Sequence, residues 1–200
     1  MNIVCLDMEG TLTPEIWIAV SEATGIPELS ITTRDEPDYD KLMRRRLRIL
    51  KEHGLGLPEI QTVIGGIEPL PGARQFLDEL RAAVPALILS DTFEEFAAPL
   101  IRKLGQPLLL CNSLEVAENG EILSHRMRIA HSKLASVRAL QSIGYDTVAV
   151  GDSFNDLEMI RASKAGFLFR ASDTVRRAEP DLPAFSDYPD LLEAILEAVR

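Results

Sequence analysis

The sequence predicts an α/β protein with a doubly wound parallel sheet and a small helical cap inserted after the first strand. The chain starts with a short apolar run at 3–6, which is typical of a buried strand. From Gly72 onward, apolar strand-like runs alternate regularly with helix-like stretches. Such alternation indicates parallel strands joined by right-handed crossovers. Between these two parts, residues 14–68 show helical periodicity.

Two carboxylates follow the first strand. Asp7 and Glu9 come directly after Ile3-Val4-Cys5-Leu6 at spacing i, i+2, so both side chains can face the same way at the carboxyl end of the strand. Open α/β sheets bind ligands at that edge. The segment alone is equally compatible with a surface turn. Acidic groups beside a buried strand are costly unless they meet a cation or donors, so positive partners are expected further along the chain.

Residues 14–68 are predicted to form the helical cap. One helix begins near Pro14 and ends before Gly25, and a long helix runs from about Tyr39 to His53. A short helix at 58–64 follows. The long helix also has basic residues, which we expect to form a cationic patch or a solvated face: Lys41, Arg44, Arg45, Arg46, Arg48 and Lys51.

A hinge is predicted where the cap returns to the sheet. Gly65-Gly66 is followed by prolines at 69 and 71, and this combination is typical of a break between elements. The predicted division is therefore an α/β core of residues 1–13 and 69–200 and a cap of residues 14–68.

The core elements are predicted in alternating order. Helices are expected at 73–83, 94–104, 132–143 and 188–199, and strands at 86–89, 108–111, 147–150, 166–169 and 182–185. Residues 113–128 are expected to form a hairpin, because Asn119-Gly120 is a strong turn signal.

Composition limits the partners. A net charge of −10 and a pI of about 4.8 argue against nucleic acid and against an anionic membrane surface. The chain has no apolar run of about 20 residues and no signal-peptide pattern, so we expect a soluble, cytoplasmic protein. Cys5 and Cys111 lie in apolar runs, as reduced core thiols do.

Three predicted strands end in the same kind of polar group. These groups are Asp7 with Glu9, Ser90-Asp91-Thr92, and Asp152 with Asp156. In a parallel sheet they meet at one edge, where several carboxylates repel one another unless a cation holds them. Oxygen ligands of this kind suit Mg²⁺. Lys133 begins the next predicted helix and is placed to neutralise a transferring phosphoryl group.

Other catalytic patterns are absent from the sequence. It contains no HExxH or paired-cysteine zinc pattern, no Walker A motif and no G-x-S-x-G. The three histidines are scattered. A zinc hydrolase, a P-loop enzyme and a serine or cysteine hydrolase are therefore poorly supported.

Four motifs in order resemble those of the haloacid-dehalogenase (HAD) superfamily of aspartyl-phosphate phosphatases. They are Asp7-Met8-Glu9-Gly10-Thr11, Ser90-Asp91-Thr92, Lys133 and Gly151-Asp152-Ser153-Phe154-Asn155-Asp156. The resemblance covers essentially the whole chain and implies a HAD-like, Rossmannoid fold. An insert directly after the first motif is similar to the small helical cap of phosphoserine phosphatases.

Further segments resemble one branch of those enzymes, which also acts as a phosphoserine:homoserine phosphotransferase. The segments are Glu9, Pro14-Glu15-Ile16-Trp17, Thr33-Arg34-Asp35 and Arg46-Leu47-Arg48-Ile49-Leu50.

The resemblance implies a role for each core motif. Asp7 would be the nucleophile that forms an aspartyl-phosphate, and Glu9 would protonate the leaving oxygen and then deprotonate water. Mg²⁺ would be held by the Asp7 carboxylate, the Glu9 backbone carbonyl and Asp152. Asp156 would orient these groups or bind the metal through water. Lys133 would stabilise the charge of the transition state.

The resemblance also implies how a substrate is bound. Ser90 and the Asp91 N–H would bind phosphate oxygens, and Asn155 would contact the phosphate or the substrate. From the cap, Arg46 would take the carboxylate and Glu15 the ammonium group of phosphoserine. Homoserine would be a second substrate. Glu9 stands where most of the superfamily has Asp, and our hypothesis is that the longer side chain slows water attack.

Three alternatives remain open from the sequence. The chain could be a HAD phosphatase for another small phosphate monoester, although the pair of Arg46 and Glu15 favours an amino-acid zwitterion. It could be a catalytically weak HAD protein that binds a metabolite, although no core motif residue is missing. It could be an acidic α/β domain whose carboxylates are merely solvated. The sequence does not decide between a monomer and a homodimer.

Overall fold

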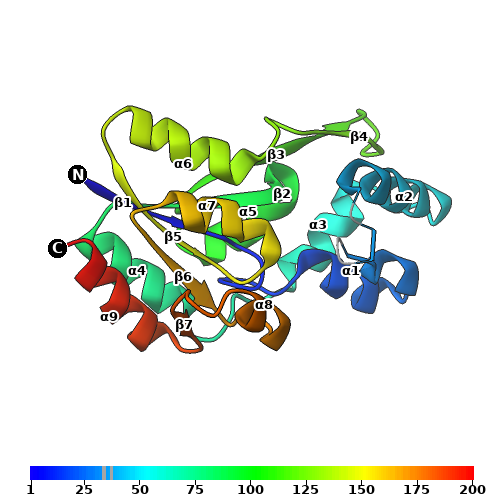
Figure 1. Ribbon diagram of the computed structural model, residues 1–200. Helices are drawn as coiled ribbons and strands as arrows, with labels where there is room; N and C mark the ends of the chain where they lie inside the picture. The colour runs from blue at the N-terminus through cyan, green and yellow to red at the C-terminus, as the bar shows by residue number, and fades with distance from the viewer. Residues whose placement is uncertain (33–34, 37) are drawn as a thin grey trace.

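A seven-stranded sheet with helices on both faces forms the body of the molecule in the computed structural model, which describes residues 1–32, 35–36 and 38–200 (Figure 1). The strand order is β4-β3-β2-β1-β5-β6-β7. The strands are β1 (Asn2–Leu6), β2 (Ala86–Phe93), β3 (Leu108–Val116), β4 (Ile122–Arg126), β5 (Asp146–Gly151), β6 (Ala165–Phe169) and β7 (Ala184–Phe185). β4 pairs antiparallel to β3 through the expected hairpin, and the remaining pairs are parallel. The α/β fold class predicted from the sequence is confirmed.

The central strand β1 separates two apolar cores. In register, Cys5 pairs with Leu87 of β2 and Ala149 of β5, whereas Leu6 pairs with Ile88 and Val150. Successive strand residues point to opposite faces, so these two rows enter different cores. The Cys5 row packs with residues of α6 (Ser132–Ser142) and α7 (Leu157–Ala162). The Leu6 row joins the larger core with α4 (Ala73–Ala83), α5 (Glu94–Lys103) and α9 (Tyr188–Ala198).

Tyr188 fixes the start of α9 against the sheet. Its ring stacks on Phe76 of α4, with ring centroids 4.9 Å apart, and lies 4.7 Å from the ring of Phe169 at the end of β6. Its Oη donates a hydrogen bond to the carbonyl of Thr11 at 2.8 Å. The side chain is buried. One tyrosine therefore connects the loop after β1 with the last helix.

Three helices of the segment after β1 lie together at one end of the molecule (Figure 1, right). They are α1 (Ile16–Thr24), α2 (Tyr39–Glu52) and α3 (Leu57–Gly65), with a 3-10 turn, η1 (Pro27–Ser30), between the first two. Trp17 of α1 packs edge-on against Phe96 of α5 at 5.5 Å between centroids. We propose that these elements form the cap, residues 14–68, on a core of 1–13 and 69–200.

Most predicted elements appear within a few residues of their expected ends. β2 extends beyond its apolar run into Ser90-Asp91-Thr92, which lines the cavity described below, and β3 extends to Val116 because its second half pairs with β4. Two short helices, α7 and α8 (Asp173–Ala178), were not predicted. Thr33 and Arg34 of the Thr33-Arg34-Asp35 motif lie outside the described residues.

No helix in the described part of the chain combines the length and the apolarity that crossing a membrane requires.

Candidate active site

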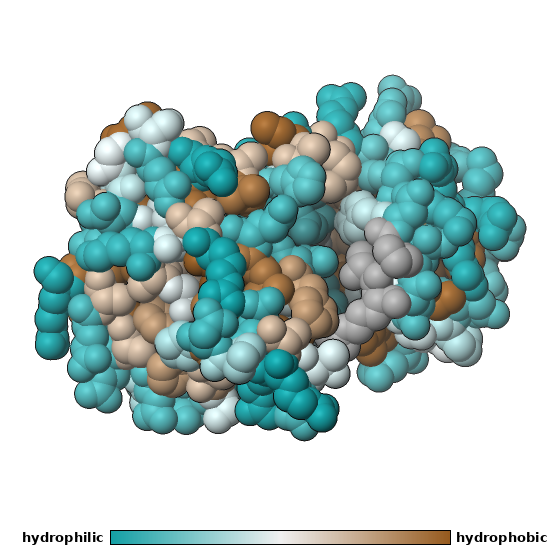
Figure 2. Space-filling model, viewed as in Figure 1, coloured by the Kyte–Doolittle hydropathy of each residue, from teal (hydrophilic) through white to brown (hydrophobic). Residues whose placement is uncertain are grey.

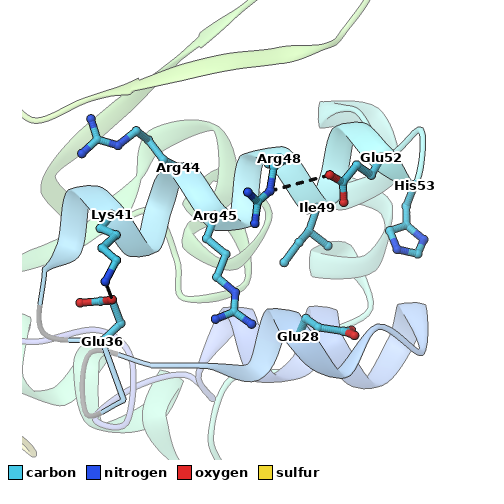
Figure 3. Close-up of a pocket in the computed structure, with 9 residues that line it drawn as sticks. All are labelled: Glu28, Glu36, Lys41, Arg44, Arg45, Arg48, Ile49, Glu52 and His53. Carbon is cyan, nitrogen blue, oxygen red and sulfur yellow. Dashed lines mark ion pairs between the residues drawn. The ribbon is translucent and has the colours of Figure 1, made fainter.

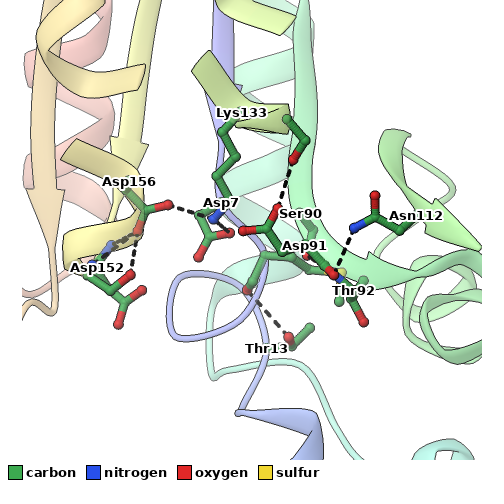
Figure 4. Close-up of polar contacts among 12 residues, drawn as sticks. Asp7, Thr13, Ser90, Asp91, Thr92, Asn112, Lys133, Asp152 and Asp156 are labelled. Atoms are coloured by element: carbon green, nitrogen blue, oxygen red, sulfur yellow. Dashed lines mark hydrogen bonds and ion pairs between the residues drawn. The ribbon is translucent and has the colours of Figure 1, made fainter. Parts of the chain in front are cut away.

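Lys133 lies between two buried carboxylates at the carboxyl edge of the sheet (Figure 4). Asp7 directly follows β1, and Asp156 ends a 3-10 turn, η2 (Phe154–Asp156), that follows β5. Lys133, in the first turn of α6, places its Nζ 2.6 Å from Asp7 Oδ1 and 2.6 Å from Asp156 Oδ1. Burial lowers the pKa of Lys133, but the two carboxylates outweigh it and hold the pKa well above its usual range. The lysine is therefore a fixed positive charge.

Asp156 is held rigidly by its own loop. Its Oδ2 accepts hydrogen bonds from the backbone N–H groups of Asp152 and Ser153, at 3.1 and 3.0 Å, and from Ser153 Oγ at 3.0 Å. The absence of a side chain at Gly151 makes this possible, because a Cβ there would lie 2.3 Å from Asp156 Cγ. Asp156 thus positions Lys133 and the neighbouring loop.

Three carboxylates are close enough to share a cation. Asp7, Asp152 and Asp156 each offer an oxygen, and these atoms lie within 4.8 Å of one another. Burial and then the charge of Asp156 raise the pKa of Asp7 well above its usual range in spite of Lys133, so one lysine does not balance the cluster. Oxygen-only donors of this kind fit a hard divalent cation. Gly10 leaves room for Asp152, since a Cβ at Gly10 would lie 2.6 Å from its Cγ.

Glu9 points toward the helical segment. Its Oε2 accepts a hydrogen bond from the backbone N–H of Ile16 at 2.8 Å, at the start of α1. Burial, followed by the negative charge of Glu15, raises the pKa of Glu9 to about 7, while the Ile16 bond and the charge of Arg46 oppose the shift. A carboxyl group with that pKa can give and take a proton near neutral pH.

The Ser90-Asp91-Thr92 segment is fixed by bonds from several elements. Ser90 Oγ accepts from the Thr92 N–H at 3.2 Å, and Asp91 Oδ1 accepts from Ser132 Oγ at 2.7 Å. Asn112 Nδ2 donates to the Asp91 carbonyl at 3.0 Å. Ser90 itself is buried. This part of β2 is therefore a preorganised polar edge.

Arg46 lies inside the molecule, and the expectation that it belongs to the exposed basic face of its helix is wrong. Only 5% of the residue is exposed. Its guanidinium carbon lies 4.5 Å from the centre of the Trp17 ring, and Nη2 donates to the Ile31 carbonyl at 2.7 Å. Position 46 follows Leu42 and Met43 at helical spacing and so shares their buried face.

The guanidinium of Arg46 still has an unused donor. Its buried Nε finds no hydrogen-bond partner among residues 1–32, 35–36 and 38–200. Burial lowers its pKa to about 10, which leaves the group charged at neutral pH. Arg46 also lines the cavity described next, and a charged guanidinium in such a place is suited to receive an anionic ligand.

One cavity of about 470 Å³ brings together the residues singled out in the sequence. The candidates that line it are Asp7, Glu9, Glu15, Arg46, Ser90, Asp91, Lys133, Asp152 and Asn155. Asp156, which is fully buried, lies behind them next to Lys133. Glu15 and Asn155 are exposed at the rim. Residues more than 100 positions apart thus meet around one space.

Sequence reasoning assigned no site role to several other side chains that line this cavity, among them Trp17, Tyr39 and Arg170. Arg170 directly follows β6, so the rule that ligands bind at the carboxyl ends of parallel strands could have identified it. Its guanidinium carbon lies 4.9 Å from the ring centres of Phe169 and Tyr188. Trp17 and Tyr39 come from the helical segment, where apolar spacing alone does not distinguish a cavity wall from a core.

A second, larger hollow of about 760 Å³ lies along the basic side of α2 (Figure 3). Two of its cations have acidic partners within the hollow: Lys41 pairs with Glu36, and Arg48 Nε lies 3.7 Å from Glu52. In Figure 2 this end of the molecule is predominantly hydrophilic. The hollow therefore has the character of a solvated charged surface, and the smaller cavity holds the chemistry.

The contents of the smaller cavity point to phosphoryl transfer. The cavity holds a buried carboxylate beside a fixed lysine, three carboxylates close enough to share a divalent cation, and a carboxyl group with a pKa near 7, and such a reaction needs groups of these kinds. The buried, charged Arg46 lines the same cavity and adds a positive charge to it.

Comparison with known proteins agrees with this chemistry. Residues 1–164 match the model of the haloacid dehalogenase-like hydrolases. The chain is 50% identical over 198 residues to "Phosphoserine phosphatase ThrH" of Pseudomonas aeruginosa, covering 99% of this chain and 97% of that protein. It is 49% identical over 198 residues to "Phosphoserine phosphatase" of Pseudomonas syringae pv. tomato, covering 99% of this chain and 84% of that protein.

Solved structures share the fold. A substrate-bound phosphoserine phosphatase complex superposes with a TM-score of 0.79 at 20% identity, covering 96% of this chain and 97% of the other. A phospho-aspartyl intermediate analogue of phosphoserine phosphatase gives a TM-score of 0.78 at 20% identity, with 96% and 98% covered.

Proposed function

Because the chain belongs to the haloacid dehalogenase-like hydrolases, we propose that it is a phosphoserine phosphatase that acts through an aspartyl-phosphate on Asp7. The observation that carries this proposal is the cavity in which Asp7 and Lys133 face the buried Arg46. Identity of 50% along nearly the whole length of a protein named phosphoserine phosphatase supports it.

Asp7 is the nucleophile of the proposed reaction. One carboxylate oxygen bonds to phosphorus while the bond from phosphorus to the serine oxygen breaks. Lys133 lies 2.6 Å from Asp7 Oδ1 and is positively charged, so it stabilises negative charge that develops on the transferring group. Ser90 and the Asp91 N–H bind the phosphate oxygens from the edge of β2.

Glu9 moves the protons. In the first step it gives its proton to the departing serine oxygen, and in the second it takes a proton from the water that attacks the aspartyl-phosphate. A pKa of about 7 suits both halves of this cycle near neutral pH. The Ile16 N–H holds the carboxyl group in place through both steps.

Mg²⁺ is the proposed cofactor. The Asp7 carboxylate, the Glu9 backbone carbonyl and Asp152 would hold it, with Asp156 as an orienting group, and the carboxylate oxygens within 4.8 Å of one another fit this donor set. Bound there, the ion supplies positive charge that offsets repulsion between the nucleophile and the phosphate.

The cap recognises the amino-acid end of the substrate. Arg46 takes the carboxylate through donors that include the buried Nε, and Glu15 at the rim takes the ammonium group. Asn155 contacts the phosphate or the substrate at the mouth. A sugar phosphate would need neither group of this pair. The proposed location is the cytoplasm, where thiols stay reduced, and this agrees with the two free cysteines, Cys5 and Cys111.

Homoserine is the proposed second acceptor. Once serine has left, an alcohol in place of water can attack the aspartyl-phosphate, and homoserine carries the same carboxylate and ammonium groups for Arg46 and Glu15. Glu9 is one methylene longer than Asp, which favours an alcohol over water through its placement.

The test is an assay with Mg²⁺ and L-phosphoserine, with and without homoserine, that follows both free phosphate and phosphohomoserine. We expect phosphate in both cases and phosphohomoserine when homoserine is present. Asp7→Asn should abolish both products, and substantial turnover by that variant would contradict the assignment of the nucleophile. Activity on a generic aryl phosphate without activity on phosphoserine would retain the chemistry and reject the substrate.

A further inference from the structure

Tyr39 connects the helical segment to the polar edge of β2. It is the first residue of α2 and lines the active-site cavity. Its Oη donates a hydrogen bond to the backbone carbonyl of Asp91 at 3.0 Å. Because 52 residues separate the two, this bond fixes where α2 sits over the site.

The Asp91 carbonyl is a shared acceptor. Asn112 Nδ2 donates to the same oxygen at 3.0 Å (Figure 4), and Asn112 Oδ1 in turn accepts from the Arg128 N–H at 3.0 Å. The Asp91 side chain is held separately by Ser132. Residues outside α2 therefore hold Asp91 in place, and the hydrogen bond from Tyr39 attaches α2 to this fixed residue.

The ring of Tyr39 packs against the β3–β4 hairpin. It packs edge-on against His125 of β4, with ring centroids 6.2 Å apart, and His125 also packs against Phe93 at 6.2 Å. His125 Nε2 lies 3.2 Å from Asp40 Oδ1, next to Tyr39 in the chain. Burial, then the charges of Asp91 and Glu9, raise the pKa of Tyr39 above its usual value, so the hydroxyl stays a donor.

Tyr39 and Arg46 share one face of α2. They are seven residues apart, which is about two helical turns, and both line the same cavity. A rigid helix that is held at Tyr39 is therefore held at Arg46 as well. The hydrogen bond from Tyr39 to Asp91 therefore sets the distance between Arg46, which is proposed to bind the carboxylate, and the Ser90–Asp91 segment, which is proposed to bind the phosphate.

We propose that Tyr39 is a positioning residue that sets the span between Arg46 and the Ser90–Asp91 segment, and that it thereby selects phosphate esters with a carboxylate at the matching distance. The inference rests on the proposed function, because phosphoserine is the ester whose two ends these groups bind. Tyr39 itself does not take part in the chemical step.

The first test removes only the hydroxyl. Tyr39→Phe keeps the ring against His125, and loss of one hydrogen bond should lower kcat/KM for phosphoserine about 5- to 10-fold, mainly through KM. An aryl phosphate has no carboxylate, so its kcat/KM should change less than about 2-fold. Tyr145→Phe is the matched control, because Tyr145 does not line the cavity, and it should leave both substrates unchanged.

A double-mutant cycle separates positioning from a general loss of structure. In an Arg46→Ala background, Tyr39→Phe should have almost no further effect on phosphoserine, since the group it positions is gone. Losses that multiply in the double variant would overturn the proposal. An equal loss on phosphoserine and aryl phosphate would overturn it too, because Tyr39 would then act on the phosphate-binding segment alone.

Amide hydrogen exchange makes the inference independent of the substrate. In the free protein, Tyr39→Phe should speed exchange at residues 39–43 and 91–93 about 5-fold, while Tyr145→Phe should not. Unchanged exchange would overturn the proposed contact. Suppose that the wild-type protein fails to turn over phosphoserine while Tyr39→Phe still speeds exchange. In that case the proposed function is wrong, but the positioning role of Tyr39 stands and applies to a different phosphate ester.

Discussion

Arg46 is a charged side chain that the protein buries beside its reaction site. Its guanidinium lies over Trp17 and keeps Nε without a partner in the described part of the chain. A donor left unsatisfied in this way costs about 1–3 kcal/mol, so the fold tolerates it where a ligand completes the bond. Under the proposed function, Arg46 exchanges some stability of the free protein for recognition of the substrate carboxylate.

Replacing Arg46 should separate recognition from chemistry. We expect Arg46→Ala to raise the KM for phosphoserine about 100-fold, equivalent to about 3 kcal/mol, because a charge-assisted contact is lost. Turnover of an aryl phosphate should change little. Steady-state kinetics on both substrates give the measurement, and Arg45→Ala, at an exposed neighbouring position of α2, is the control. Equal losses on both substrates would assign Arg46 a structural role.

The length of Glu9 should set the balance between transfer and hydrolysis. In Glu9→Asp the carboxyl group is shorter by one methylene and shifts by about 1 Å, a displacement that matters for proton transfer. We expect the ratio of phosphohomoserine to phosphate to fall several-fold, because water would then compete better than homoserine for the aspartyl-phosphate. The assay compares both products at fixed homoserine. A ratio equal to that of the wild type would exclude Glu9 as its cause.

At the scale of elements, the loop after β1 is shaped by a glycine. Gly10 has a φ of +79°, and a Cβ at this position would lie 2.6 Å from Asp152 Cγ. Gly10→Ala should therefore displace a proposed metal ligand as well as strain the backbone by about 1 kcal/mol. We expect activity to fall at least 10-fold and the Mg²⁺ concentration for half-maximal activity to rise.

Gly144→Ala controls for the strain alone. Gly144 has a φ of +91°, and an added Cβ would meet nothing within 4 Å. This variant should lose a similar unfolding free energy, measured by denaturant titration, and keep full activity. If both variants keep wild-type activity and metal dependence, the close approach of Gly10 to Asp152 has no catalytic importance.

The elements that could be predicted from the sequence are those with a strong repeat. The long amphipathic α2 and the buried β1 and β5 were placed well because burial on one face or on both leaves a clear pattern. The short helices α7 and α8 have six residues each and give too little periodicity to detect. Arg46 was assigned to the wrong face because charge suggests exposure, whereas packing against Trp17 decides it.

The candidate site was predictable for a related reason. Parallel strands bring their carboxyl ends to one edge, so the order of polar groups along the chain already implied that Asp7, Asp91 and Asp152 meet. Tyr39 and Asn112 could not be found in this way. Their roles depend on a shared acceptor, the Asp91 carbonyl, which is a backbone atom that sequence patterns do not describe.

At the scale of the whole molecule, Tyr188 links stability to alkaline pH. Burial raises its pKa to about 12 from the usual value near 10, with the charge of Arg170 opposing the shift. Above about pH 10 the unfolded chain loses this proton while the folded protein retains it, so the free energy of unfolding falls as pH rises from about 10 to about 12. We expect the loss to be about 1–2 kcal/mol.

Tyr188→Phe measures this contribution. The variant loses the bond to the Thr11 carbonyl and is less stable at pH 8, but its unfolding free energy should fall less steeply between pH 10 and 12. Denaturant titrations of both proteins across that range give the two slopes. Parallel slopes would show that other groups cause the alkaline loss.

The central position of β1 also governs when the enzyme can become active during its own synthesis. β1 is synthesised before both of its neighbours in the sheet, which are β2, beginning at Ala86, and β5, beginning at Asp146. Asp7 can meet Lys133 and Asp156 only after the chain has been synthesised through residue 156. Nascent chains therefore carry Asp7, the proposed nucleophile, without Lys133, and we expect chains that end before β5 to be inactive.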